Sequence, residues 1–172
     1  MRKPEGTETV HNVSRIVTYP HFNRVTGQHD IALLELTDMV EFNRMVSPVC
    51  LPHPGANFLG RDCVVTGWGD TKNTGDPEVL QWVIVPVIGP SECQRKYPKS
   101  SRHNIFSSNI CAGSRHKDSC GGDSGGPLVC RTEGRWVVAG LVSWGEGCGT
   151  SHPGVYTNVP SYVAWIAQTV GE

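Results

Sequence analysis

The chain has no excess of charge of either sign, because 15 Lys and Arg stand against 16 Asp and Glu, a formal net charge of −1 over 172 residues. Such a balance argues against nucleic acid or another polyanion as a partner. Only 18% of the residues are charged and 38% are hydrophobic, which excludes an intrinsically disordered chain. Long apolar runs are also missing, and with them any stretch of the roughly 20 residues that a membrane-spanning helix needs.

Other signals are absent at particular places. The first six residues, Met1-Arg2-Lys3-Pro4-Glu5-Gly6, are polar and lack the apolar core of a secretion signal. His53, His103 and His116 lack the spacing of metal ligands, and His152 is expected to be a surface loop residue. We therefore expect no zinc site, no other metal and no cofactor.

Glycine, proline and cysteine, by contrast, are plentiful. The 20 glycines and 12 prolines divide the chain into short segments, of which residues 79–85 and 136–142 are rich in β-branched and aromatic residues. Short strands between turn residues predict an all-β barrel or sandwich. Two covering helices are expected: residues 90–97, with a proline and the capping Ser91 at the start, and the amphipathic residues 161–168. The seven cysteines are typical of a protein from an oxidising compartment.

The most informative stretch is Asp118-Ser119-Cys120-Gly121-Gly122-Asp123-Ser124-Gly125-Gly126-Pro127. It places a serine in a glycine-rich turn, where unusual backbone dihedrals are allowed and a substrate backbone can approach closely. Ser124 is the candidate nucleophile, and it needs a base within hydrogen-bond reach because a serine hydroxyl is weakly nucleophilic at neutral pH. The backbone N–H groups of Gly122 and Ser124 are the candidate oxyanion hole.

The same residues also satisfy the G-x-S-x-G pattern of α/β-hydrolases, with Ser124 at its centre. That pattern requires a helix directly after the serine. Pro127 and the strand-like Leu128-Val129-Cys130 argue against a helix there. We therefore set this alternative aside.

The ten-residue string resembles the active-site serine loop of the chymotrypsin-like serine proteases, specifically of their trypsin-like branch. Four further segments resemble motifs of the same family, in the same order: Asp30-Ile31-Ala32-Leu33-Leu34-Glu35-Leu36, Cys63-Val64-Val65-Thr66-Gly67-Trp68-Gly69, Ser143-Trp144-Gly145-Glu146-Gly147-Cys148 and Pro153-Gly154-Val155-Tyr156-Thr157. The resemblance runs from about Val10 to Gln168.

This resemblance implies a fold of two six-stranded antiparallel barrels with the active site in the cleft between them. We expect an all-β single domain over residues 1–170, in which residues 1–49 are a remnant of the first barrel, 50–62 a linker, and 63–172 the second barrel with a C-terminal helix. The N-terminal barrel would be incomplete. Because a barrel removes its strand edges only by closing, we expect exposed edges, low stability and aggregation of the isolated chain.

The resemblance also assigns roles in catalysis and specificity. Asp30 would accept a hydrogen bond from the catalytic histidine, fix its tautomer and stabilise the imidazolium. Asp118 would form the floor of the primary specificity pocket and select Arg or Lys through a charge-assisted hydrogen bond. Four residues would bind substrate along the pocket walls: Ser143, Trp144, Gly145 and Gly154. Larger side chains at the two glycines would block the slot.

Two parts of the family's machinery have no counterpart in the sequence. The family places its histidine before the aspartate, and His11, His21 and His29, which precede Asp30, do not lie in the family's context. The family also pairs the carboxylate at Asp123 with an amino terminus freed by zymogen cleavage, and no segment of that type precedes the aspartate. A buried carboxylate without its cation costs about 3–5 kcal/mol. We therefore expect the oxyanion loop to be zymogen-like or disordered.

Three disulfides are implied by the resemblance: Cys63–Cys130, Cys93–Cys111 and Cys120–Cys148. A seventh cysteine, Cys50, is left over. In family members built behind other modules, a cysteine in this context links the protease to an upstream chain or module, so Cys50 would lack its partner. The alternative is a free surface or partly buried thiol.

The sequence thus predicts a trypsin-like serine endopeptidase that cleaves after Arg or Lys through an acyl-enzyme on Ser124, with peptide substrates and protease inhibitors as partners. We expect this chain itself to be inactive, because the base and the activation terminus are missing and loss of the base alone costs up to about a million-fold in kcat. The alternative is a non-catalytic binding module that uses the Asp118 pocket to hold basic peptide ends. The parent protein is expected to be extracellular.

Overall fold

The computed structural model describes residues 6–73, 75, 76, 78–97 and 104–171. The strands formed by these residues are β1 (Val13–Thr18), β2 (Ala32–Leu36), β3 (Asp62–Gly67), β4 (Gln81–Ile88), β5 (Asn109–Ala112), β6 (Pro127–Thr132), β7 (Arg135–Trp144) and β8 (Gly154–Asn158). The helices are α1 (Pro90–Lys96), the short 3-10 helix η1 (Val159–Ser161) and α2 (Val163–Val170).

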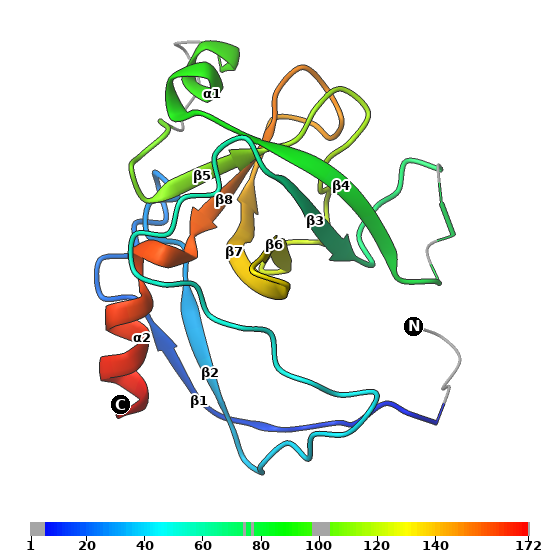
Figure 1. Cartoon of the computed structure of the whole chain (residues 1–172), viewed down its shortest axis with the longest axis vertical. Helices are drawn as coiled ribbons and strands as arrows, with labels where there is room; N and C mark the ends of the chain where they lie inside the picture. Colours follow the sequence, from blue (N-terminus) through cyan, green and yellow to red (C-terminus); the bar gives the residue numbers. More distant parts are fainter. Residues whose placement is uncertain (1–5, 74, 77, 98–103, 172) are drawn as a thin grey trace.

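Strands β3 to β8 close into a barrel in the order β3-β4-β5-β8-β7-β6, and every neighbouring pair is antiparallel. Strands β1 and β2 form a separate two-stranded sheet, which lies beside α2 and away from the body of the barrel (Figure 1). The expected all-β, chymotrypsin-like architecture is confirmed: a closed barrel, a second sheet and a C-terminal helix. The predicted internal boundaries at residues 50 and 63 stay predictions.

The barrel encloses the hydrophobic core. Along β3 and β4 every second side chain points inward, as the two-residue period of a strand requires, and Val65, Val85 and Val87 are buried. Leu128 from β6 and Tyr156 from β8 complete the filling and are fully buried. Burial of each Val or Leu side chain contributes roughly 1.5–3 kcal/mol, so the barrel is the stable body on which the site is built.

Three disulfides tie this body together: Cys63–Cys130, Cys93–Cys111 and Cys120–Cys148. They are the pairs that the family resemblance implies. The first joins β3 to β6 where the barrel closes, the second joins α1 to β5, and the third joins the serine loop to the segment after β7. Cys50 is exposed and outside any disulfide. Its backbone lies along β7, where it accepts a 3.0 Å hydrogen bond from the Val138 N–H.

Both expected helices form, with corrections at their ends. The residue that caps α1 is Gly89, and no side chain caps the helix, so the predicted capping role of Ser91 is wrong. Helix α2 begins at Val163, two residues later than predicted, because the preceding residues form η1 around Pro160. It ends at Val170, and the following Gly171, with a left-handed φ of 86°, donates its N–H to the Ala167 carbonyl.

The two-stranded sheet presents apolar side chains to solvent. Ile16 and Leu34 lie directly opposite each other across β1 and β2, with 63% and 58% of their surfaces exposed. An aromatic cluster fastens the sheet to the C-terminal helix: the Tyr19 ring packs edge-on against Tyr162 at 5.1 Å and against Trp165 at 5.2 Å. This contact brings the loop that carries Asp30 to the side of the barrel. None of the helices in the described part of the chain is long and apolar enough to cross a membrane.

Candidate active site

Asp30 stands at a tight turn just before β2. The residue before it, His29, has a left-handed φ of 59°, and the Ile31 N–H donates to the His29 carbonyl at 2.9 Å. Two barrel residues hold Asp30 in place: the Ser143 hydroxyl donates to its Oδ2 at 2.7 Å, and the Thr157 hydroxyl donates to its main-chain carbonyl at 2.6 Å. The candidate orienting carboxylate is thus attached to β7 and β8 of the barrel although it comes from the smaller sheet.

The candidate nucleophile lies in a loop of two consecutive turns. The first turn is closed by the Asp123 N–H, which donates to the Cys120 carbonyl at 3.1 Å, and the second by the Gly126 N–H, which donates to the Asp123 carbonyl at 2.8 Å. The third positions of these turns are Gly122 at φ 96° and Gly125 at φ 78°. A side chain is strained at such angles, so glycine at both positions is what lets the chain turn twice in succession.

Ser124 is exposed on the second turn. Within the described residues, no protein acceptor engages the N–H of Gly122 or of Ser124, and their role as an oxyanion hole stays a prediction. Nor does any imidazole in this part of the chain bond to the Ser124 hydroxyl. The histidine adjacent to the orienting acid, His29, is bound elsewhere, with its Nδ1 2.9 Å from the Tyr162 hydroxyl. Burial, and then the charge of His21, lower the pKa of His29, so its ring favours the neutral form.

Asp123 points into a cradle formed by backbone. Its Oδ1 accepts from the Gly69 N–H at 2.8 Å and its Oδ2 from the Cys120 N–H at 2.9 Å. A Cβ atom on Gly69 would lie 2.6 Å from Oδ1, and one on Gly67 would also collide with the carboxylate. No cation pairs with Asp123 among the described residues, but two N–H donors offset part of its desolvation cost. The expected zymogen-like or disordered state of this loop stays a prediction, and so does the expected role of Asp123 in an activation pair.

Asp118 is half-buried at the base of the same loop. Its Oδ1 accepts from the Ser119 N–H at 2.9 Å and its Oδ2 from the Gly149 N–H at 3.1 Å. Burial raises the pKa of Asp118 to about 6, although these donors and the charge of Lys72 act in the opposite direction. Ionisation of the Asp118 carboxyl group therefore costs free energy, and a cation bound beside it would offset that cost.

Gly154 and Gly145, the two wall glycines, differ in the space they leave. A Cβ atom on Gly154 would lie 2.7 Å from the Asp118 Oδ1, so a side chain there is incompatible with the carboxylate position. A Cβ atom on Gly145 would make only ordinary contacts, the nearest at 3.7 Å. Asp118 and Asp123 share the lining of a cavity of about 370 Å³ that also borders Lys72, and neither Gly145 nor Gly154 lines it.

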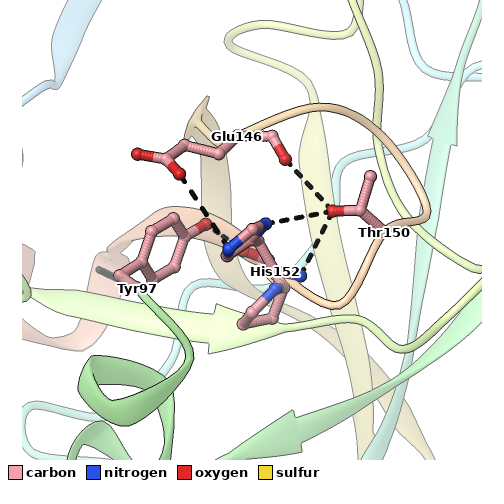
Figure 2. Close-up of polar contacts among 5 residues, drawn as sticks. Tyr97, Glu146, Thr150 and His152 are labelled. Atoms are coloured by element: carbon pink, nitrogen blue, oxygen red, sulfur yellow. Dashed lines mark hydrogen bonds and ion pairs between the residues drawn. The ribbon is translucent and has the colours of Figure 1, made fainter. Parts of the chain in front are cut away.

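Tyr97 and His152 support the pocket wall, and the sequence reasoning missed both. The Tyr97 hydroxyl donates to the Pro153 carbonyl, and its ring packs 5.1 Å from Trp144. His152 lies in the loop between β7 and β8, as expected, with 27% of its side-chain surface exposed. Its ring lies 5.4 Å from the Tyr97 ring and its Nδ1 is 3.4 Å from the Thr150 hydroxyl (Figure 2). Thr157 was missed as well, although a polar residue in an otherwise apolar strand end is a usable signal.

Among the described residues, no group of three or more His, Cys, Asp or Glu side chains lies close enough together to hold a metal ion. The described residues include an exposed serine in a double turn, the Asp30 carboxylate held by Ser143, and the half-buried carboxylate of Asp118. Such a set is suited to acyl transfer on a substrate with a basic side chain, once a proton acceptor is added.

Comparison with known proteins identifies relatives of this chain. The family model described as "Trypsin" matches residues 1–166. The chain is 42% identical over 171 residues to the trypsin of Sus scrofa, an alignment that covers 96% of this chain and 70% of that protein. It is 44% identical over 166 residues to Trypsin-1 of Astacus astacus, covering 94% of this chain and 68% of that protein. It is also 44% identical over 165 residues to Transmembrane protease serine 9 of Rattus norvegicus, covering 93% of this chain but 15% of that much longer protein.

Proposed function

Because the chain belongs to the trypsin family of serine proteases, we propose that it carries the nucleophile and the specificity pocket of an endopeptidase that cleaves after Arg or Lys. The observation that carries this proposal is the placement of Asp118. Its half-buried carboxylate, held by two backbone N–H groups, lies six residues before Ser124 and beside a glycine whose Cβ would displace it. A guanidinium or ammonium group is the ligand that such a carboxylate favours.

In the complete reaction, the Ser124 oxygen adds to the carbonyl carbon of the scissile peptide bond while its proton passes to an imidazole. The N–H groups of Gly122 and Ser124 stabilise the oxyanion, the C–N bond breaks as the proton passes to the leaving amine, and water then hydrolyses the acyl ester. Asp30, attached to Ser143 and Thr157, orients the imidazole.

That imidazole is not supplied by the described residues of this chain. Without it the chain taken alone is close to inert, because the general base contributes several orders of magnitude to kcat. The three disulfides support an extracellular setting for the protein, and protein substrates and inhibitors with Arg or Lys are the expected partners. An upstream chain linked through Cys50 stays a prediction.

The test separates binding from hydrolysis. The full chain is titrated with benzamidine, a single-cation probe of the slot, and is separately incubated with an arginine-like phosphonate that labels activated serines. We expect saturable benzamidine binding that is lost in Asp118→Asn. We expect mass spectrometry to find no phosphonate adduct on Ser124, whereas porcine trypsin, the positive control, should be labelled. Absence of benzamidine binding would contradict the proposal that Asp118 binds a cation. An adduct on Ser124 would contradict the proposal that the chain alone is inactive.

A second candidate function, a non-catalytic module that holds basic peptide ends, is supported by the engagement of His29 with Tyr162 rather than with Ser124. The two functions differ in the ligand they favour. A module for chain ends binds a peptide with C-terminal Arg at least as tightly as one that continues past the Arg. A protease cleft favours the longer peptide, because it must hold both sides of the scissile bond. Dissociation constants for acetyl-Ala-Ala-Arg and acetyl-Ala-Ala-Arg-Ala-Ala-amide decide between them.

A further inference from the structure

The two-stranded sheet carries a motif that the proposed mechanism does not use. Asn12-Val13-Ser14 is the single Asn-X-Ser or Asn-X-Thr triplet of the sequence. In the secretory pathway such a triplet accepts an N-linked oligosaccharide when its middle residue is not proline. The oligosaccharide is bulky, so the asparagine must also lie where the folded protein leaves room for it.

The side chain of Asn12 lies in solvent and is free of contacts. Asn12 directly precedes β1 and is exposed. Its backbone carbonyl accepts from the Thr37 N–H at 2.8 Å and from the Thr37 hydroxyl at 3.0 Å, and these bonds fix the start of the strand. Its side-chain amide makes no hydrogen bond within the described residues. A substituent on the Asn12 Nδ2 therefore breaks no contact of the folded protein.

Asn12 belongs to the polar face of the two-stranded sheet, which lies away from the body of the barrel (Figure 1). Val13 pairs with Leu36 on the apolar face, and neighbouring residues of a strand point to opposite faces. Asn12 is therefore on the side of Arg15 and Glu35, whose charged groups lie 2.7 Å apart with more than half of each side chain exposed. A hydrated oligosaccharide is compatible with this charged face.

The contact of Ser14 indicates when the modification takes place. Ser14 lies at the register shift of β1, and its hydroxyl donates to the Glu35 carbonyl at 3.1 Å. The glycosylating enzyme requires the hydroxyl residue of the triplet, so it must act before this bond forms. A two-stranded sheet alone is marginally stable, and this one depends on contacts with barrel residues such as Thr157 and Tyr162. The acceptor therefore stays open until those contacts form.

We propose that Asn12 is an N-glycosylation site and that its oligosaccharide covers the polar face of the two-stranded sheet. The donor is a lipid-linked oligosaccharide diphosphate. The Asn12 Nδ2 forms a bond to C1 of the first sugar, the C1–O bond to the diphosphate breaks, the diphosphate leaves with the electron pair, and the amide nitrogen loses a proton. This proposal rests on the extracellular setting proposed above and is independent of the Asp118 slot.

Glycosylation at this position makes the two faces of the sheet unequal. The oligosaccharide keeps the face of Arg15 and Glu35 in solvent and excludes a protein partner from it. Ile16 and Leu34 lie on the other face and remain uncovered. Any protein that binds the two-stranded sheet must therefore use the apolar face.

The experiment is cell-free translation of the full chain behind a cleavable secretion signal, in the presence of microsomes. Protease added afterwards destroys untranslocated chain, so every surviving molecule has reached the compartment in which the enzyme acts. We expect most of the protected chain to run as one heavier band, which endoglycosidase H returns to the unmodified position. This shift should be lost in Asn12→Gln and in Ser14→Ala. It should persist in Ser14→Thr, which keeps the triplet, and in the matched control Asn43→Gln, whose asparagine lies outside any triplet.

A further variant shows that the assay detects a used triplet in this chain. Val25→Thr creates a triplet at Asn23, in an exposed turn, and should add a second shift. A glycan at Asn23 without one at Asn12 overturns the proposal. A protected parent chain that stays unshifted also overturns it, and so does a shift that survives Asn12→Gln. Benzamidine binding is measured separately, so its failure would count against the proposed function and leave this result unchanged.

Discussion

The hydroxyl of Ser143 donates a 2.7 Å hydrogen bond to the carboxylate of Asp30, across 113 positions of sequence. Ser143 stands near the end of β7, the strand that leads into the pocket wall, and Asp30 belongs to the loop before β2. The bond therefore couples the recognition wall to the acid that would orient the base. A change in the position of Ser143 is therefore expected to change the position of the Asp30 carboxylate.

Replacement of Ser143 by alanine removes this donor from a half-buried carboxylate. We expect Ser143→Ala to lower the free energy of unfolding by about 1–3 kcal/mol, the usual cost of an unsatisfied buried acceptor. Urea denaturation followed by tryptophan fluorescence measures the change. Ser91→Ala, on the exposed face of α1, serves as the control and should be near neutral. Equal midpoints for both variants would show that Asp30 does not depend on the bond.

The two wall glycines should differ in their tolerance of a methyl group. In Gly154→Ala the new Cβ atom would lie 2.7 Å from the Asp118 Oδ1, so the carboxylate must move and benzamidine affinity should fall about tenfold or more. In Gly145→Ala the nearest atom is at 3.7 Å, and affinity should stay within about threefold. Isothermal titration calorimetry distinguishes these outcomes, and the reverse order would refute the assigned slot geometry.

Cation binding should depend on pH through Asp118. Burial raises its pKa to about 6 in the empty protein, so the carboxyl group is neutral below that pH and charged above it. Benzamidine binding is therefore expected to weaken as the pH falls through 6 and to level off near pH 8. The raised pKa also lowers the free energy of unfolding above pH 6, because the Asp118 carboxyl group ionises at a lower pH in the unfolded chain than in the folded protein. Asp118→Asn should then gain stability at pH 8, and a flat affinity profile in the parent chain would contradict the assignment.

The backbone cradle of Asp123 should tolerate no side chain. In Gly69→Ala the added carbon would lie 2.6 Å from the Asp123 Oδ1 and 2.8 Å from the Gly121 carbonyl oxygen. The second contact is with backbone, which yields little, so we expect a loss of about 1–3 kcal/mol and a fall in Tm of several degrees. Gly121→Ala is the matched control, since nothing lies within 4 Å of its Cβ position. Similar melting temperatures for the two variants would argue against the cradle.

The exposed apolar face of the small sheet should drive self-association of the isolated chain. Ile16 and Leu34 pair across β1 and β2 with more than half of each surface exposed, and such sheet faces favour aggregation. Sedimentation velocity over a concentration series should show association that decreases in the double variant Ile16→Lys, Leu34→Glu. Val25→Lys, on a residue that is 81% exposed in a turn, should leave it unchanged. A monomeric parent chain would refute this prediction.

Much of the fold followed from periodicity. The alternating β-branched runs predicted β4 and β7, because one face of each barrel strand is buried. The order of strands around the barrel was not predicted, since pattern alone does not pair strands, and the family resemblance implied only a six-stranded antiparallel barrel. The start of α2 was misplaced because Pro160 directs the chain into a 3-10 turn first, a choice that helical periodicity does not encode.

The site divides in the same way. Asp118, Asp123 and Ser124 lie within one short loop, so the local motif singled them out, while the roles of the two aspartates were implied by the family resemblance. Thr157 and Ser143 act on Asp30 over more than a hundred positions, and such contacts depend on how two sheets dock. The loop position of His152 was predicted, but its ring contact was not, because the partner is Tyr97 at the end of α1, which no local pattern brings to that loop.

The attachment of β1 and β2 also has a consequence for synthesis. Their docking partners, Ser143, Thr157 and Tyr162, are encoded after most of the barrel. Strands β1 and β2 therefore leave the ribosome before the barrel residues against which they dock have been made. During that interval the apolar side chains of β1 and β2 are exposed and can be bound by chaperones. Slow translation of the later residues would prolong this exposure.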